Sequence, residues 1–147
     1  MPDSPVNEKP AWIVLVEDNP ADVTLVRQAL YEYQVRYQLT VLIDGESAIQ
    51  LLDRLDQECT RSPDLVLLDV KLPKKGGFDV LARVRASAYC RSVPVVILTS
   101  SGAQRDQDTA AKLGVTQYIR KPSRFEDFIQ LGKDLKEILV KGSDSPA

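Results

Sequence analysis

Hydrophobic residues along the chain form short continuous runs that alternate with longer segments of helical periodicity. The runs have the length of a strand and are bounded by turn residues, as expected for strands buried on both faces of a parallel sheet. We expect strands over residues 11–16, 38–43, 65–70 and 93–98, and a short fifth strand around residues 118–119.

Each run is followed by a segment in which apolar residues recur every three or four positions. In the first of these segments they stand at positions 23, 26, 30 and 33, the spacing of one helix face. Asn19 can cap this helix, with Pro20 at its first position and Asp22 near its positive end. Further helices are expected after Gly45, after Gly77, over residues 105–113 and over a last segment with apolar positions 128, 131, 135 and 138.

Strict alternation of strand and helix predicts an α/β fold, a doubly wound parallel sheet with helices on both faces. Five strands favour the flavodoxin-like order 2-1-3-4-5, in which ligands bind beyond the carboxyl ends of the first and third strands. We expect a flexible extension over residues 1–10, one domain over residues 11–141 and a flexible tail over residues 142–147.

Composition narrows the classes of function. The 147 residues suffice for one globular domain, and a net charge of −2 offers no basic surface for nucleic acid or for a membrane. The chain does not start with a basic stretch followed by an apolar one, so we expect a cytoplasmic protein whose Cys59 and Cys90 are inert thiols. The absence of histidine excludes Ser-His-Asp and Cys-His catalysis and imidazole-bound zinc.

Acidic residues stand at the ends of two apolar runs. Glu17 and Asp18 follow the first run, and Asp69 lies at the end of the third. Either acid alone could simply cap a loop, but these two strands end at one crevice, where close carboxylates disfavour full ionisation. A hard divalent cation, Mg²⁺ in a cell, and Lys121 after the fifth run would neutralise them. Such a site would accept an added anion, and a phosphoryl group fits.

Five separated motifs resemble one family in the order in which they occur. They are Glu17-Asp18, Asp69, Leu72-Pro73 with Gly76, Thr99-Ser100 and Lys121-Pro122. Together they look like the signature of receiver domains of two-component response regulators, over about residues 11–140. The resemblance implies a signalling protein, not an enzyme with a separate substrate. It would take a phosphoryl group from a sensor histidine kinase and signal through a phosphorylation-dependent protein-binding surface.

The resemblance assigns the acceptor and the metal to the acids. It implies that Asp69 is the phosphoacceptor, a nucleophilic carboxylate that attacks phosphorus in line. It also implies that Asp18, Asp69 and the main-chain carbonyl of Lys71 bind Mg²⁺, which Mn²⁺ could replace, while Glu17 helps to hold the ion through water. Lys71 and Ser101 would tune the lifetime of the phosphoryl group, because hydrolysis needs a water in line with the acyl phosphate.

The same resemblance assigns the residues of the switch. Thr99, Ser100 and Lys121 are expected to contact the phosphoryl oxygens, and the Lys121-Pro122 bond is expected to be cis. Tyr118 occupies the position of an aromatic switch and should turn inward as Thr99 moves towards the phosphoryl group. From the residues alone, Thr99 could be an ordinary turn hydroxyl and Tyr118 an aromatic packed at the edge of the sheet.

A narrower resemblance concerns the small single-domain response regulators that partner bacterial phytochrome kinases. Residues 16–22 and 72–75 look most like that subgroup, which implies a phytochrome as the kinase. Gly77 departs from the subgroup's acid-glycine step, at a place expected to touch only the start of a helix. No output domain is expected after Val140. The chain would then act on an unknown downstream protein or as a homodimer through the 105–113 helix, the fifth strand and the last helix.

Other classes of protein use similar residues. A phosphohydrolase of the haloacid dehalogenase type normally has a second Asp two residues after its nucleophile, where this chain has Lys71. A flavin-binding flavodoxin-like module cradles phosphate with a hydroxyl- and glycine-rich loop, whereas residues 17–22 are acidic. A phosphorelay intermediate is a further alternative. So is a docking receiver that is never phosphorylated, although the complete set of acids, Thr99 and Lys121 argues against it.

Overall fold

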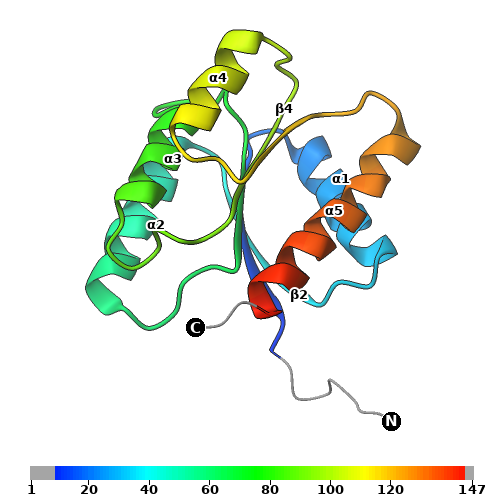
Figure 1. Cartoon of the computed structure of the whole chain (residues 1–147). Helices are drawn as coiled ribbons and strands as arrows, with labels where there is room; N and C mark the ends of the chain where they lie inside the picture. The colour runs from blue at the N-terminus through cyan, green and yellow to red at the C-terminus, as the bar shows by residue number, and fades with distance from the viewer. Residues whose placement is uncertain (1–8, 145–147) are drawn as a thin grey trace.

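The computed structural model describes residues 9–144, which form a five-stranded parallel sheet covered by helices. The elements are β1 (Ala11–Val16), α1 (Pro20–Glu32), β2 (Tyr37–Leu42), α2 (Gly45–Glu58), β3 (Leu65–Leu68), α3 (Gly77–Ala86), β4 (Val95–Thr99), α4 (Gln104–Lys112), β5 (Gln117–Arg120) and α5 (Phe125–Asp144). The strand order is β2-β1-β3-β4-β5. Figure 1 shows α1 and α5 on one face of the sheet and α2, α3 and α4 on the other. The predicted fold is confirmed.

Two central strands have other limits than the sequence pattern predicts. β3 stops at Leu68, so that Asp69 begins the loop that leads to α3. β4 begins at Val95 and not at residue 93, because Pro94 lacks the backbone N–H that a central strand needs. At its other end β4 includes Thr99, which pairs with Arg120 of β5. Thr99 therefore belongs to the strand and not to the turn after it.

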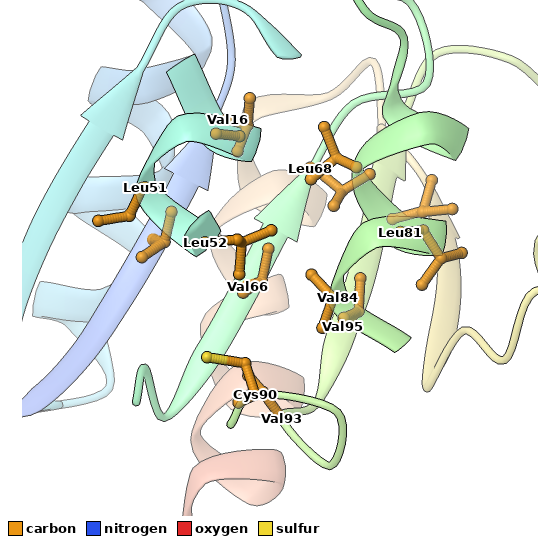
Figure 2. Close-up of a cluster of buried hydrophobic side chains, with 14 of the residues drawn as sticks. Val16, Leu51, Leu52, Val66, Leu68, Leu81, Val84, Cys90, Val93 and Val95 are labelled. Carbon is orange, nitrogen blue, oxygen red and sulfur yellow. The ribbon is translucent and has the colours of Figure 1, made fainter. Parts of the chain in front are cut away.

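Apolar side chains on the two faces of the sheet form two layers of core. Under α1 and α5 lie Ile13, Leu15, Leu65 and Leu67, all buried. Figure 2 shows the opposite layer, with Val16, Leu51, Leu52, Val66, Leu68, Leu81, Val84 and Val95. Because successive residues of β1 and β3 alternate between the layers, both strands are buried on both faces. This double burial explains their unbroken apolar sequence.

α5 packs against α1 at a point where a side chain would not fit. A Cβ atom on Gly132 would lie 2.2 Å from the carbonyl oxygen of Ala29 and 2.6 Å from a ring carbon of Tyr33. Glycine lowers the helical propensity of α5 by about 1 kcal/mol relative to alanine. It also lets the two helix backbones approach closely, so Gly132 sets the distance between α1 and α5.

α5 is longer than the sequence pattern predicts. The helix continues through Gly142 to Asp144, beyond the boundary at residue 141 that the sequence pattern predicts. A helix that has already formed gains one backbone hydrogen bond for each residue added, which favours its extension. Residues 145–147, and residues 1–8 of the predicted extension, lie outside the described residues.

Within the part of the chain that the structure describes, no helix has the length and apolar character needed to cross a membrane.

A polar network joins the end of α2 to the loop after α3. Asp56 accepts hydrogen bonds from the hydroxyl of Ser87, from Arg83 Nη2 at 2.7 Å and from the backbone N–H of Tyr89 at 3.2 Å. Ser87 is fully buried. The hydrogen bond from Ser87, and then that from Arg83, lower the pKa of Asp56 below its ordinary value. The network holds the α3–β4 loop against the body of the domain.

The single tryptophan lies near the amino-terminal end of β1, opposite to the carboxyl ends of the strands. Trp12 Nε1 donates to Thr40 Oγ1 at 2.9 Å, and its backbone N–H donates to Asp64 Oδ2 at 2.7 Å. The guanidinium of Arg61 lies 5.6 Å from the centre of the indole ring. These contacts fix β1 to β2 and to the start of β3 at this end of the sheet.

Candidate functional site

Side chains at the carboxyl ends of three strands meet around one ammonium group. Lys121 follows β5, and its Nζ lies 2.8 Å from Glu17 Oε1, 2.8 Å from Asp22 Oδ2 and 2.9 Å from Asp69 Oδ2. None of these side chains is more than 18% exposed. The structure thus brings together three of the predicted site residues, Glu17, Asp69 and Lys121, and adds Asp22 to them. We call these four residues the Lys121 cluster.

Asp69 is held through both of its carboxylate oxygens. Oδ2 contacts Lys121, and Oδ1 accepts a hydrogen bond from the backbone N–H of Lys71 at 3.2 Å. The Asp69 backbone also packs closely against the start of α3. A Cβ atom added to Gly77 would lie only 2.0 Å from the Asp69 carbonyl oxygen. The expectation that Gly77 touches only the start of α3 is therefore wrong. The first turn of α3 rests directly on the backbone of Asp69, which only glycine permits.

Burial and ion pairing act on the cluster in opposite directions. Burial raises the pKa of Glu17 above its ordinary value, although the hydrogen bond from Lys121 opposes it. Burial also disfavours the charged form of Lys121, but hydrogen bonds to Asp22, Glu17 and Asp69 outweigh it and raise the pKa of Lys121 well above its ordinary value. Lys121 is therefore a permanent cation at neutral pH, shared among three carboxylates.

Thr99 and the serines after it lie at the same edge of the sheet in different surroundings. Thr99 is fully buried, and its Oγ1 accepts from the backbone N–H of Ser101 at 3.3 Å. Its carbonyl accepts from the backbone N–H of Lys121 at 2.7 Å, so the end of β4 positions the lysine. Ser100 is exposed. Ser101 Oγ donates to Asp106 Oδ2 at 2.6 Å, which connects this loop to the first turn of α4.

Tyr118 joins the same loop from β5. Its ring packs against the core layer shown in Figure 2, and its hydroxyl donates to the carbonyl oxygen of Ser101 at 2.8 Å. Because Ser101 also donates its backbone N–H to Thr99, the aromatic ring and the buried threonine are connected through one residue. The structure shows one position of Tyr118, and its change of rotamer stays a prediction.

One expectation for the site is not met. The described residues contain no cis peptide bond, so the Lys121-Pro122 bond is trans and the prediction of a cis bond is wrong. Even before proline the trans form is favoured by about 0.5–1 kcal/mol. Asp18 is exposed in the loop after β1, outside the Lys121 cluster. Among residues 9–144, no group of three or more acidic, cysteine or histidine side chains is arranged to hold a metal ion.

The donor set nevertheless suits a hard cation. Glu17, Asp18 and Asp69 offer carboxylate oxygens, the ligands that Mg²⁺ and Mn²⁺ prefer. Two of these carboxylates already direct an oxygen at one cationic centre, the Lys121 ammonium, at 2.8 and 2.9 Å. The ammonium supplies part of the charge that a divalent ion would bring. Metal and lysine would therefore share these oxygens.

Asp22 is the site residue that sequence reasoning missed. An acid in the first turn of a helix is explained by the helix dipole alone, and 99 residues separate Asp22 from Lys121. One signal could have revealed it. α1 begins just beyond the carboxyl end of β1, so its first turn lies beside the same crevice as the acids that follow the strand.

Comparison of the sequence with known families and proteins gives a consistent result. The response regulator receiver domain family matches residues 13–132. The probable methanogenesis regulatory protein FilR2 of Methanothrix harundinacea (strain 6Ac) is 37% identical over 95% of this chain and 90% of its own length. Response regulator Rcp1 of Synechocystis sp. is 32% identical over 94% of this chain and 95% of its own length.

Solved structures agree with this assignment. The phosphorylated cyanobacterial phytochrome response regulator RcpA has a TM-score of 0.82 and 33% identity, covering 95% of this chain and 100% of RcpA. The Mn²⁺-bound form of Rcp1 has a TM-score of 0.81 and 32% identity, covering 94% of this chain and 100% of Rcp1. The receiver domain of the Pseudomonas aeruginosa sensor histidine kinase PA1611, with a magnesium ion in its active-site cleft, has a TM-score of 0.71 and 28% identity, covering 93% of this chain and 100% of that domain. The chain belongs to the response regulator receiver domain family, the two-component signalling modules that accept a phosphoryl group from a sensor histidine kinase.

Proposed function

We propose that Asp69 is the residue that accepts the phosphoryl group. The observation that carries the proposal is the placement of its carboxylate, nearly buried at the carboxyl end of β3, against Lys121 and beside Glu17. A carboxylate held in this way is a preorganised nucleophile, because its position is fixed before the donor arrives.

In the proposed reaction, an oxygen of Asp69 forms a bond to phosphorus while the bond from phosphorus to the donor breaks on the opposite side. Lys121 then contacts the oxygens of the transferred group as a point charge. Glu17, Asp18, Asp69 and the carbonyl of Lys71 would hold Mg²⁺, which neutralises charge on the phosphoryl group when it is bound. The hydroxyl of Thr99, at the end of β4, and Ser100, which follows it, would contact the phosphoryl oxygens.

The signal would leave the site through the loop between β4 and α4. Phosphorylation adds about −1.5 to −2 charges, which attract the Thr99 hydroxyl. A movement of Thr99 changes the position of Ser101, and Ser101 is bonded to Asp106 of α4 and to Tyr118 of β5. The α4–β5–α5 surface therefore responds to the phosphorylation of Asp69. The position of Ser101, with that of Lys71, also supports their role in setting the lifetime of the acyl phosphate.

The proposed location of this protein is the cytoplasm, and its proposed partner is a sensor histidine kinase. The similarity of this chain to RcpA supports a phytochrome in that role.

The proposed form of the phosphorylated protein is a homodimer through α4, β5 and α5. The exposed edge of β5 and the 53% exposed side chain of Phe125 at the start of α5 support this interface. Light scattering should show a dimer in the presence of Mg²⁺ and beryllofluoride, an analogue of the phosphoryl group. A monomer with and without the analogue would contradict the interface.

Mass spectrometry after incubation with Mg²⁺ and acetyl phosphate tests the acceptor. The wild-type protein should gain the mass of one phosphoryl group, and the gain should require Mg²⁺. The Asp69→Asn variant should gain nothing, whereas Asp108→Asn, a matched change on the exposed face of α4, should behave as the wild type. A phosphoryl group on the Asp69→Asn variant would show that another residue is the acceptor.

A further inference from the structure

The first turn of α1 carries a carboxylate that contacts the Lys121 cluster and not the N-cap residue of its own helix. Asp22 is the third residue of α1, the position from which an acid commonly reaches back to the backbone of the N-cap residue. Here the backbone N–H of Asn19 donates to Glu17 Oε2 at 3.2 Å instead. The carboxylate of Asp22 extends to Lys121 at 2.8 Å, across from α1 to the end of β5.

The Lys121 ammonium has three carboxylate partners, Glu17, Asp22 and Asp69, as many as it has N–H groups. A phosphoryl group on Asp69 would bring new oxygens that need one or more of these N–H groups. The N–H that contacts Asp69 could turn to these oxygens, but a second contact would require Glu17 or Asp22 to release the lysine. Glu17 would be drawn to Mg²⁺, which leaves Asp22 as the carboxylate that holds Lys121 away from the product.

We propose that Asp22 is a positioning residue that competes with the phosphoryl group on Asp69 for the Lys121 ammonium, and thereby weakens the phosphorylated state. The proposal rests on the proposed function of Asp69. Asp22 lowers the affinity of the site for an anion in two ways. Asp22 withholds a charge-assisted hydrogen bond from the phosphoryl oxygens, and its negative charge repels an incoming anion.

The surroundings of the pair keep this competition from being screened by solvent. The side chains of Lys121 and Asp22 are 12% and 18% exposed. Ion pairs at exposed sites contribute little because water and salt screen them. A largely buried pair retains more of its energy, so the presence of Asp22 should be visible in the affinity for an anion at Asp69.

Beryllofluoride binding at saturating Mg²⁺ measures this affinity without a reaction. Titrations by calorimetry would compare the wild type with Asp22→Asn and with Glu46→Gln. Glu46 is an exposed acid in the first turn of α2, so its variant loses the same charge at a helix start outside the cluster. Because one charge-assisted hydrogen bond is released to the anion, Asp22→Asn should bind beryllofluoride about tenfold more tightly than the wild type. Glu46→Gln should stay within about twofold of the wild type, because the charge of this exposed side chain is screened by water and salt.

Tighter binding is a result that damage to the fold would not produce. If Asp22→Asn does not fold, Asp22→Ser removes the same charge and should give the same gain. An affinity of either variant equal to or weaker than that of the wild type would overturn the competition while leaving Asp69 as the acceptor. Failure of the wild type itself to bind beryllofluoride with Mg²⁺ would overturn both proposals.

Discussion

The position of Asp69 depends on a neighbour that has no side chain. Gly77 begins α3 directly against the carbonyl oxygen of Asp69, whereas Gly76, one residue earlier, has room beside it. The two adjacent glycines therefore differ in what they allow. One fixes the acceptor, and the other only caps the helix.

Gly77→Ala should move the Asp69 backbone and slow phosphorylation. The added Cβ would lie 2.0 Å from the Asp69 carbonyl oxygen, and overpacking of this kind costs about 1–3 kcal/mol. Because small displacements of a nucleophile have large effects on rate, we expect phosphorylation by acetyl phosphate to slow by about tenfold or more. The measurement is the rate of mass gain together with the unfolding midpoint in urea.

Gly76→Ala is the matched control for this prediction. Its Cβ would lie 3.5 Å from the carbonyl oxygen of Val70, an ordinary contact. Its phosphorylation rate should stay close to that of the wild type. Equal rates for the two variants would show that the close approach of Gly77 does not position Asp69.

The sequence was informative about single residues wherever the position along a strand decided the role. Glu17, Asp69 and Lys121 could be predicted as neighbours because each follows a parallel strand, and such ends meet at one edge. Asp22 could not, because a helix start already explains an acid. The conformation of the Lys121-Pro122 bond was wrongly predicted from resemblance, since nothing in the dipeptide itself distinguishes cis from trans.

Among the secondary-structure elements, α1 and α5 depend most on each other. They cover one face of the sheet together and touch through Gly132, Ala29 and Tyr33. A pattern of apolar residues predicts both helices but not their distance, because that distance is set where side chains are absent. The apolar pattern also missed the limits of β4. Pro94 and the pairing of Thr99 determine these limits, and hydrophobicity does not.

Two glycine-to-alanine changes in α5 should have opposite effects on stability. Gly132→Ala would place a Cβ 2.2 Å from the carbonyl oxygen of Ala29, and it should lower the free energy of unfolding by about 1–3 kcal/mol. Gly142→Ala has nothing within 4 Å and should raise it by up to about 1 kcal/mol through helical propensity. Urea denaturation of both variants measures the difference. Stabilisation by both changes would mean that α1 and α5 can separate at no cost.

For the whole molecule, the alternation of strands and helices was sufficient to predict the fold. The buried central strands and the strand order followed from the sequence, because β1, β3 and β4 are apolar on both faces and each crossover has one favoured hand. The polar network around Asp56 was not predicted. Its members come from α2, α3 and the loop after α3, and no local pattern connects them.

This network should make the stability of the domain depend on acid. The pKa of Asp56 is lower in the folded protein than in the unfolded chain, so the unfolded state binds the proton more readily. The stabilisation by Asp56 is therefore fully present above about pH 4 and is lost as the pH falls through the folded-state pKa. Asp56→Asn should be less stable than the wild type at neutral pH, and the difference should shrink towards about pH 3.

Urea denaturation across this pH range is the measurement, and Asp53→Asn is the matched control. Asp53 contacts the same Arg83, but its side chain is 56% exposed, so its replacement should change stability little at any pH. A constant difference between the wild type and Asp56→Asn at all pH values would contradict the prediction.

The position of Trp12 determines which changes of this protein its tryptophan fluorescence can detect. The indole is bonded to Thr40 and stacked by Arg61, and about 16 Å separate it from Glu17 along β1, at a strand rise of roughly 3.3 Å per residue. Its fluorescence should therefore respond to unfolding but not to Mg²⁺ or to phosphorylation. Trp12 would then serve as an intrinsic fluorescent probe of folding that does not change with phosphorylation.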